Sequence, residues 1–403
     1  METLLIKDGL DRAARLIKAG QLVAVPTETV YGLACNGLDE RAVADIYEVK
    51  GRPPIKPLSL MVGGAEDMER YCLDIPAAAY TLAKKYWPGP LTIVLKAKNS
   101  VPEIVRAGGS TVGLRCPDHP MTQELLRRSD LPFAAPSANP SGQPSPKNAD
   151  KVMEYFDGKI AAVLDGGDCG IGKESTLIDM SCTPYKVLRE SALSCKELAA
   201  TLAGEMKIVG ITGGSGCGKT TALGELEKLG ALIIDCDALY HSLLKENDEL
   251  KSELFAAFPG CERDGAVDRK ALGLVVFNDG EALKRLNAIT HRHIGLAVES
   301  LIEKHAMNGG SLAAIDAVEL ISSGISKRCD LLVGISADKD VRIKRIMARD
   351  GIDYEAARLR IDAQRPDSYY KENCHAVIAN NGDVDKFINE FKNILQEAFK
   401  WTN

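Results

Sequence analysis

The sequence contains no apolar run that could cross a membrane and no cysteine pair spaced for a metal ion. No stretch approaches about 18 consecutive apolar residues, and the 11 cysteines include no C-x-x-C pair and no Cys/His ligand spacing. We therefore expect reduced thiols, no structural zinc, no disulfide framework and no membrane partner. The first twenty residues alternate charge with apolar side chains at helical spacing, so we expect no signal peptide and a cytoplasmic location.

The sequence also lacks an excess of positive charge. Its net charge is −6, with 24 basic and 25 acidic residues in 1–203 and 26 basic and 31 acidic residues in 204–403. Neither half has the excess of basic residues that is typical of proteins that bind nucleic acid over a large surface. A basic groove on one part of the surface is still compatible with these totals. A length of 403 residues is typical of two or three domains, and each half is long enough to bury its own core.

Two patterns of strands divide the chain. The first half predicts a helix over 40–51 and strands over 21–27, 91–97, 110–117, 161–167 and 175–180, with a Pro/Ser/Asn-rich loop over 131–149. These elements do not alternate regularly, which favours a mixed α+β sheet. The second half predicts strands over 206–212, 231–237, 312–318 and 329–336 with helices between them, which is typical of a parallel α/β sheet. The sequence thus predicts an α/β protein with two domains, 1–203 and 204–403, joined by segment 191–205, which we expect to be mostly helical.

A glycine-rich loop opens the second half. Gly213-x-x-x-x-Gly218-Lys219-Thr220 follows a predicted strand and precedes a predicted helix, as in phosphate-binding P-loops. Its glycines let backbone N–H groups surround phosphates, its lysine reaches the β- and γ-phosphates, and the Thr220 hydroxyl is a ligand for Mg²⁺. The predicted ATP-binding residues are Gly213, Gly214, Ser215, Gly216, Cys217, Gly218, Lys219, Thr220 and Thr221.

Two aspartates, Asp235 and Asp237, follow the next predicted strand in "IIDCDALYH". A carboxylate beside a P-loop can accept the proton of an attacking hydroxyl. An aspartate at a strand–helix junction also serves as a helix N-cap. We interpret Asp235 as the cap and Asp237 as the catalytic base.

From the P-loop onward the chain resembles dephospho-CoA kinases. "GITGGSGCGKTT", "IIDCDALYH", "ITHRHI", "RIMARDGIDYEAARLRIDAQRP" and "VIANNGD" carry the resemblance. It implies transfer of the γ-phosphate of ATP to the ribose 3′-hydroxyl of dephospho-CoA, with Asp237 as the base. Arg349 and Arg365 are then candidates to cover the triphosphate, or else solvated helix charges. His291 is not assigned to catalysis, because a core or capping histidine explains it equally well.

The chain departs from this family at two places near the acceptor side. Arg292 stands where the family usually has proline, and "DAVELISSG" over 316–324 lacks the proline and final glutamate of the family's Pro-Leu-Leu-aromatic-Glu patch. ATP use is therefore better supported than the acceptor, and a nucleoside or nucleotide acceptor remains an alternative hypothesis.

The first half gathers cations and small polar groups at predicted turns. "KGRPPIKPLSLMV" presents Lys50, Arg52 and Lys56 on a segment stiffened by prolines. Such fixed cations suit a polyanion such as a triphosphate. "APSANPSG" adds Ser137 and Asn139. Taken singly, each of these is also explained as a solvated side chain or a turn residue.

Taken in order, the motifs of residues 4–193 resemble the threonylcarbamoyl-AMP synthase family, which has the YrdC-like fold. The signature is a separated K-x-R…S-x-N tetrad, here Lys50, Arg52, Ser137 and Asn139, preceded by "PTETVYGL" and followed by "GKESTLID". The resemblance implies synthesis of threonylcarbamoyl-AMP and pyrophosphate from L-threonine, bicarbonate and ATP, an early step of t⁶A formation in tRNA. Mg²⁺ is expected on the triphosphate.

The resemblance also assigns site residues. Lys50 and Arg52 are the predicted catalytic cations. The predicted ATP contacts are Lys50, Arg52, Thr111, Ser137, Asn139 and Arg189, and the predicted threonine contacts are Thr27, Lys56, Arg115 and Ser175, with Arg115 on the carboxylate. Lys147 stands where the family often has threonine, and Cys35 and Cys116 are interpreted as buried small residues.

The sequence therefore predicts a bifunctional enzyme, a nucleotidyltransferase followed by a phosphotransferase. An alternative makes the first half an RNA-binding module and the kinase the only enzyme, although a net charge near −1 weighs against it. tRNA or tRNA-modification proteins are possible downstream partners.

Overall fold

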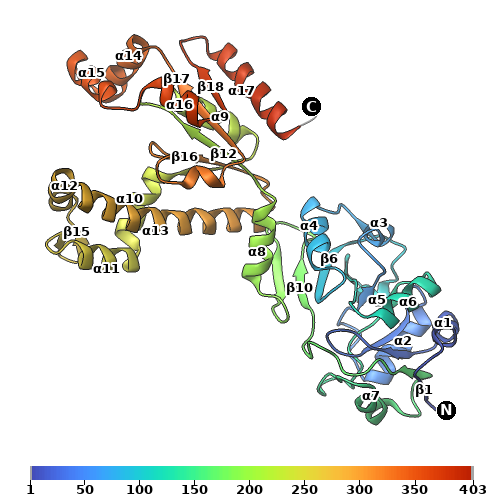
Figure 1. The fold of residues 1–403 in the computed structure, drawn as a ribbon. Helices are drawn as coiled ribbons and strands as arrows, with labels where there is room; N and C mark the ends of the chain where they lie inside the picture. Colours follow the sequence, from blue (N-terminus) through green and yellow to red (C-terminus); the bar gives the residue numbers. More distant parts are fainter. Residues whose placement is uncertain (1, 401–403) are drawn as a thin grey trace. The chain divides into compact units, whose positions relative to one another are not determined.

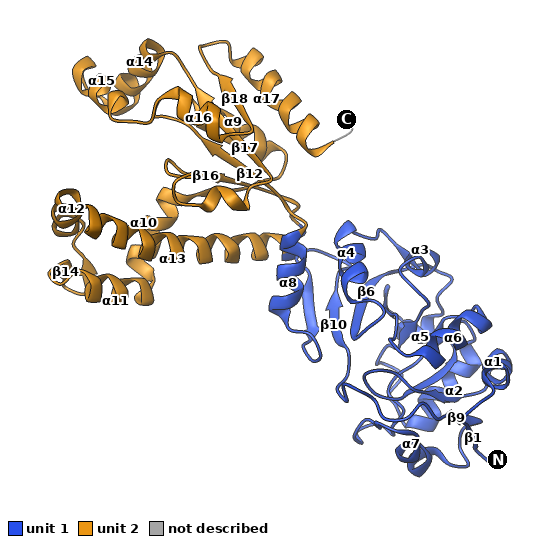
Figure 2. Ribbon diagram, viewed as in Figure 1, with its two compact units in different colours: residues 1–204, 307–309 blue, residues 205–306, 310–403 orange. Residues whose placement is uncertain are grey.

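The computed structural model describes residues 2–400. The chain forms two compact units, residues 1–204 with 307–309 (unit 1) and residues 205–306 with 310–403 (unit 2) (Figure 2). No helix within residues 2–400 has the length and apolarity needed to cross a membrane.

Unit 1 is built on one mixed sheet with the strand order β1-β9-β2-β3-β8-β4-β7-β6-β10-β11, and β5 pairs with β6. Its strands are β1 (Leu4–Ile6), β2 (Val23–Val25), β3 (Gly32–Asn36), β4 (Ser59–Met61), β5 (Cys72–Leu73), β6 (Leu91–Ala97), β7 (Thr111–Arg115), β8 (Phe133–Ala134), β9 (Ala162–Leu164), β10 (Thr176–Asp179) and β11 (Lys186–Arg189). Parallel pairs such as β4–β7 alternate with antiparallel pairs such as β6–β7. This arrangement confirms the predicted mixed sheet.

Within residues 2–400, unit 1 has eight helices, of which seven connect its strands and the last follows β11. Figure 1 shows their course along the chain. They are α1 (Leu10–Lys18), α2 (Glu40–Lys50), α3 (Asp67–Tyr71), α4 (Ala77–Tyr86), α5 (Glu103–Arg106), α6 (Pro120–Ser129), α7 (Ala149–Phe156) and α8 (Cys195–Gly204). Helix α2 has clear local signals at both ends. The Asp39 carboxylate accepts hydrogen bonds from the N–H groups of Arg41 and Ala42, and Gly51 takes the left-handed conformation (φ 59°) that ends the helix. The chain therefore leaves α2 directly into the proline-rich segment that carries Arg52.

Unit 2 contains a five-stranded, all-parallel sheet in the order β13-β16-β12-β17-β18 and a separate hairpin, β14–β15. The strands are β12 (Lys207–Thr212), β13 (Leu232–Asp235), β14 (Glu262–Arg263), β15 (Ala266–Val267), β16 (Leu312–Asp316), β17 (Leu331–Ser336) and β18 (Ala376–Ala379). The helices are α9 (Lys219–Lys228), α10 (Cys236–Glu246), α11 (Asp248–Ala257), α12 (Arg269–Asn278), α13 (Gly280–Met307), the 3₁₀ helix η1 (Ile325–Arg328), α14 (Lys339–Asp350), α15 (Tyr354–Asp362), α16 (Asp367–Asn373) and α17 (Val384–Phe399).

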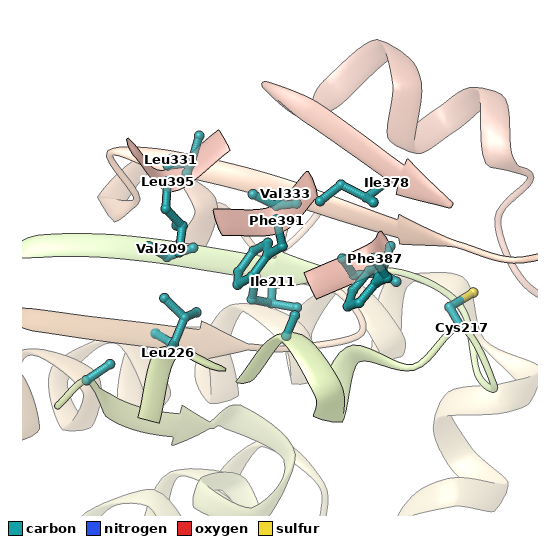
Figure 3. Packing of buried hydrophobic residues seen from close by; sticks show 14 of the residues in the cluster. Val209, Ile211, Cys217, Leu226, Leu331, Val333, Ile378, Phe387, Phe391 and Leu395 are labelled. Atoms are coloured by element: carbon teal, nitrogen blue, oxygen red, sulfur yellow. The ribbon is translucent and has the colours of Figure 1, made fainter. Parts of the chain in front are cut away.

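The core of unit 2 lies between the sheet and its helices. Figure 3 shows Phe387 and Phe391 of α17 facing Val209 and Ile211 of the central strand β12. The two phenylalanine rings are parallel, with centroids 6.4 Å apart. This packing fixes β12, and β12 carries the P-loop at its carboxyl end.

The predicted strand over 231–237 begins one residue too early and extends two residues too far at its carboxyl end. β13 ends at Asp235, because the Asp235 carboxylate accepts hydrogen bonds from the N–H groups of Asp237 and Ala238 (both 2.9 Å) and thereby starts α10. The interpretation of Asp235 as a helix cap is confirmed. Asp237 consequently lies in the first turn of a helix, not at the end of a strand.

Candidate active sites

Unit 1 contains a cavity of about 200 Å³ that is lined by residues from seven separate segments of the chain. Five predicted site residues line it: Arg52, Arg115, Ser137, Ser175 and Arg189. Because β4 and β7 run parallel, Arg115 at the end of β7 lies opposite Met61 at the end of β4, and Met61 also lines the cavity. The lining is cationic, since three arginines face one glutamate, Glu174.

Lys50 links the helix α2 to the S-x-N loop. Its ammonium donates hydrogen bonds to the backbone carbonyls of Ser137 and Asn139, and only 4% of the residue is exposed. Burial, together with the positive charge of Arg52, lowers the Lys50 pKa to about 7, against the opposing effect of Glu174. The structure therefore brings the four tetrad residues together, with Lys50 bracing the loop that carries Ser137 and Asn139.

Asn139 is held through its amide nitrogen. Its Nδ2 donates to the carbonyls of Pro140 (3.0 Å) and Gln143 (2.6 Å), and its buried Oδ1 accepts no hydrogen bond within residues 2–400. A buried acceptor without a donor is costly unless a ligand or water supplies one. This orphaned oxygen fits a ligand with hydroxyl or amino donors, such as a nucleoside.

Arg115 is fixed by a carboxylate that the sequence reasoning did not single out. Its Nη2 donates to Glu28 Oε1 and to Thr29 Oγ1, both at 2.7 Å, and Glu28 Oε2 accepts from the N–H of Asp118 at 2.9 Å. The ion pair is nearly enclosed, with 9% and 13% of the two side chains exposed. The buried Nε of Arg115 has no partner within residues 2–400, so the guanidinium retains a donor for an anion.

Arg189, the last residue of β11, is anchored to the two residues that precede β10. Its guanidinium forms an ion pair with Glu174 and donates to the Ser175 carbonyl (3.0 Å) and to Ser175 Oγ (3.3 Å). Ser175 Oγ also lies 2.8 Å from Thr92 Oγ1. Glu174 and Thr92 line the cavity but were not predicted. The sequence signal for Glu174 was its place inside the quoted motif "GKESTLID".

Five predicted residues do not line this cavity. Two of them are Lys50 and Asn139, described above, and the other three are Thr27, Lys56 and Thr111. Thr27 is buried in a turn, where its hydroxyl donates to the Val30 carbonyl (2.6 Å) and lies 2.9 Å from Thr29 Oγ1. Lys56 is exposed, and Thr111 begins β7 opposite Lys96. Their assignment to ligands stays a prediction.

In unit 2, the P-loop connects β12 to α9 as predicted. Gly213 and Gly218 have positive φ angles of 144° and 93°, and a Cβ at Gly213 would lie 2.2 Å from the carbonyl oxygen of Ile335. Only glycine fits both conditions. Gly218 is the N-cap of α9, and the Lys219 ammonium donates to the Gly213 carbonyl at 3.1 Å. The loop is thus shaped for phosphates, with its lysine folded back over it.

A second layer of side chains holds the P-loop from outside. Gln364 accepts a hydrogen bond from the Ser215 N–H (2.9 Å) and donates to Ser215 Oγ (2.7 Å). Arg342 donates to the Ser215 carbonyl (3.0 Å) and to Gln364 Oε1 (2.6 Å), and Arg345 donates to the Gly216 carbonyl (3.1 Å). None of these three residues was predicted as a site residue.

The candidate lid arginines lie elsewhere. Arg349 forms an ion pair with Asp350 (2.7 Å), and the Arg365 guanidinium lies 5.2 Å from the centre of the Tyr369 ring. Within residues 2–400, neither guanidinium forms a hydrogen bond or an ion pair with the P-loop. On helix α14, the P-loop contacts come instead from Arg342 and Arg345.

Three carboxylates meet at the carboxyl edge of the parallel sheet. Asp235 and Asp316 are paired in register across β13 and β16, and Asp237 follows Asp235 by two residues, in the first turn of α10. Burial raises the Asp237 pKa, the charge of Asp235 adds to this, and the charges of Lys219 and His241 oppose it. A carboxylate with a raised pKa is a better proton acceptor for a hydroxyl.

Asp316 is a further candidate site residue, which the sequence analysis did not single out. Burial raises its pKa to about 6, opposed by Lys219 and reinforced by Asp235 and Asp237. Its buried Oδ1 has no hydrogen-bond partner within residues 2–400. The stretch 316–324, where the sequence departs from the dephospho-CoA kinase pattern, therefore begins with an acidic residue close to the P-loop lysine.

A cavity of about 210 Å³ adjoins Asp237 and is lined largely by apolar side chains, with His291 and Glu319 among the polar ones. Burial lowers the His291 pKa, and the charge of Glu319 opposes this. Arg292, the residue after His291, points to a different partner and forms an ion pair with Glu253.

Within residues 2–400, no group of three or more His, Cys, Asp or Glu side chains is arranged to hold a metal ion. Mg²⁺ usually keeps several waters and binds through substrate phosphates and one or two protein ligands. The donors present near the P-loop, the exposed Thr220 hydroxyl and the partnerless Asp316 carboxylate oxygen, are of the type that Mg²⁺ prefers. The site therefore fits Mg²⁺ brought in with a nucleotide.

Comparison with known proteins gives a separate match for each half. The model of the Sua5/YciO/YrdC family, described as telomere recombination, matches residues 15–191, and the dephospho-CoA kinase model matches residues 207–386. A Sua5 structure from Pyrococcus abyssi complexed with L-threonine has a TM-score of 0.48 at 26% identity, over 83% of this chain and 100% of that one.

Three curated relatives are similar at the level of sequence. The threonylcarbamoyl-AMP synthase of Pyrococcus abyssi is 47% identical over 196 residues, which are 49% of this chain but only 57% of that protein. A putative threonylcarbamoyl-AMP synthase of Mycobacterium tuberculosis is 36% identical over 48% of this chain and 89% of its own length. The dephospho-CoA kinase of Paramagnetospirillum magneticum is 41% identical over 40% of this chain and 76% of its own length. The chain therefore belongs to the threonylcarbamoyl-AMP synthase family through its N-terminal half and to the dephospho-CoA kinase family through its C-terminal half.

Proposed function

We propose that the chain is a bifunctional enzyme with two ATP-dependent activities. Unit 1 makes threonylcarbamoyl-AMP from L-threonine, bicarbonate and ATP, and unit 2 phosphorylates the 3′-hydroxyl of dephospho-CoA. The two catalytic domains are residues 1–203 and 204–403. The observation that carries the proposal is the presence of two differently built anion sites, one lined by arginine side chains and one by backbone N–H groups.

In unit 1, the reaction brings two anions together. The amine of threonine takes up CO₂ as a carbamate, and a carbamate oxygen attacks the α-phosphorus of ATP with release of pyrophosphate. The positive charge of Arg52 and Arg189 offsets the repulsion between the two anions. Arg115, aligned by Glu28, binds the threonine carboxylate through its free donors. Mg²⁺ neutralises part of the triphosphate charge when bound.

The synthase proposal is tested by measuring pyrophosphate release from the whole chain. We expect release that requires L-threonine, bicarbonate and ATP together. Arg52→Ala should abolish it, and Lys219→Ala should leave it unchanged. Pyrophosphate release that does not depend on L-threonine would contradict the proposal. RNA binding with a steep salt dependence would instead support the RNA-binding alternative.

In unit 2, the acceptor hydroxyl is placed between the P-loop and Asp237. Asp237 takes the proton of the 3′-hydroxyl, and the oxygen attacks the γ-phosphorus while Lys219 and the P-loop N–H groups stabilise the charge on the transferred group. Thr220 and Asp316 would hold Mg²⁺, which would neutralise further negative charge on the phosphates when bound. Arg342, Arg345 and Gln364 keep the P-loop in shape.

The kinase proposal is tested with labelled ATP and a panel of acceptors. We expect the label to appear on dephospho-CoA, with loss of turnover in Lys219→Ala and at least a hundredfold lower kcat in Asp237→Asn. Arg52→Ala should leave this activity intact. A preference for a nucleoside over dephospho-CoA would refute the assignment of dephospho-CoA as the acceptor.

A further inference from the structure

Helix α12 has two faces, and the rest of unit 2 covers only one of them. Leu272 and Val276 are buried and belong to a core cluster with residues of α10, α11 and α13. Leu274, Val275 and Phe277 of the same helix are exposed by 72%, 46% and 86%. Among the described residues, no other large apolar side chain is as exposed as Phe277. Since the inner face is fully packed, this exposure does not come from a loosely held helix.

The exposed apolar side chains follow the helical repeat. Lys270, Leu274 and Phe277 are spaced four and three residues apart, which places them on one side of α12. Figure 1 shows α12 at one end of the group formed by α10, α11 and α13. Single exposed apolar side chains are common on protein surfaces, whereas neighbouring ones on one helix face mark a surface for another molecule.

The two ends of α12 carry opposite charges. Arg269 and Lys270 begin the helix, and the exposed Asp279 and Glu281 follow its end. Asp268 offsets part of the positive charge, but its carboxylate is engaged with two N–H groups of the first turn. The helix dipole has the same polarity, positive at the first turn and negative at the last. A face with this distribution of charge is complementary to itself when two copies lie antiparallel.

An antiparallel pair of α12 helices brings these groups into contact. When Leu274 of one copy lies opposite Phe277 of the other, the residues four positions further out, Lys270 and Glu281, also come opposite each other. Within one chain Glu281 pairs with Lys284 at 2.8 Å, and both side chains are largely exposed. Because exposed ion pairs contribute little stability, Glu281 is free to exchange this partner. In a two-fold arrangement each of these contacts occurs twice.

We propose that α12 is the surface through which two copies of this chain associate about a two-fold axis. Leu274 and Phe277 form the apolar centre of the interface, and Lys270 and Glu281 form its charged rim. The inference concerns association and does not depend on either proposed activity. A helix of 10 residues covers less area than the roughly 1,600 Å² of a standard interface. We therefore expect a weak dimer, with a Kd on the order of 10 µM.

The test is sedimentation equilibrium of the whole chain between about 1 and about 100 µM. The wild type should pass from monomer to dimer over this range. Phe277→Ser should raise the Kd about tenfold or more, because large apolar side chains at the centre of an interface carry most of its binding energy. The matched control is Leu296→Ser, which should leave the Kd unchanged. Leu296 is 55% exposed and lies roughly 20 Å along α13 from Glu281.

Charge reversal tests the antiparallel register. Lys270→Glu puts two acidic side chains opposite each other, and Glu281→Lys puts two basic ones opposite each other. Each variant alone should raise the Kd about tenfold, because like charges across an interface repel. In a mixture of the two variants, both contacts again join opposite charges. The mixture should therefore form a mixed dimer with about the wild-type Kd.

Three results would overturn the inference. They are a wild type that stays monomeric at every concentration, a dimer that survives Phe277→Ser, and a mixture of the two charge variants that does not associate. If the monomeric chain instead sediments with phosphatidylglycerol vesicles, α12 is a membrane-binding face and the dimer is wrong. An unchanged midpoint of urea unfolding shows that each variant is folded, since every substituted side chain is exposed.

Discussion

The Asp316 carboxyl makes unit 2 less stable at neutral pH than it would be without this charge. Its pKa is raised from 3.8 to about 6 in the folded chain, first by burial and then by Asp235 and Asp237. The folded state therefore keeps this proton at a pH where the unfolded chain has released it. By linkage, the free energy of unfolding decreases as the pH rises from about 4 to about 6 and stays lower above that range.

The size of the effect follows from the pKa shift. About two pKa units at 1.36 kcal/mol each correspond to about 2–3 kcal/mol. Asp316→Asn removes the titrating group, so at pH 7 we expect the variant to be more stable by up to this amount. For a unit of about two hundred residues, this corresponds to roughly 5–10 °C in Tm. Kinase turnover should fall at the same time, because stability gained at an active site often costs function.

Scanning calorimetry of the whole chain between pH 4 and pH 8, without nucleotide, measures this difference. The transition of unit 2 is identified as the one that a core substitution in α17 lowers. The wild type and Asp316→Asn should converge near pH 4 and separate as the pH approaches 7. Parallel curves over the whole range would refute the assignment of a raised pKa to Asp316, and a less stable variant at pH 7 would refute its sign.

Three further predictions follow from contacts in the two units. Glu28→Gln leaves Arg115 without its charged partner. The KM for L-threonine should therefore rise about tenfold, which corresponds to about 1.4 kcal/mol, with little change in the KM for ATP. An equal rise of both KM values in steady-state assays would count against a specific role of Glu28 in threonine binding. Gln364→Ala releases Ser215, and the kinase KM for ATP should rise several-fold while synthase kinetics stay constant; a synthase defect would argue for general unfolding. Phe391→Ala removes a fully buried ring and leaves a cavity. The free energy of unfolding of unit 2, measured in urea, should fall by about 3–5 kcal/mol. A loss below about 1 kcal/mol would show that neighbouring side chains move in to fill the cavity.

Features that depend on contiguous residues could be predicted. The P-loop is encoded by a run of eight residues, and its glycine conformations follow from steric limits on φ alone. The Asp235 cap is likewise local, since its carboxylate reaches N–H groups two and three residues away. The mixed sheet of unit 1 and the parallel sheet of unit 2 were also predicted, because the two have different strand–helix patterns.

Features that depend on which distant segments pack together could not be predicted. Asp316 gains its environment from the register of β16 against β13, and no local pattern marks it. Arg349 was a candidate lid residue, but it lies seven residues beyond Arg342 on α14, about 10 Å along the helix. Arg342 therefore reaches the P-loop while Arg349 pairs with Asp350.

The sequence by itself determined the two families, the phosphate-binding loop and the ordered set of cations in unit 1. Each of these is carried by residues whose chemistry is set by type and local spacing. Tertiary structure alone decided that Glu28 aligns Arg115, that Lys50 holds the Ser137–Asn139 turn and that Asp316 lies in register with Asp235. Such contacts join residues far apart in the chain, and they exist only once burial and strand register have fixed which side chains face one another.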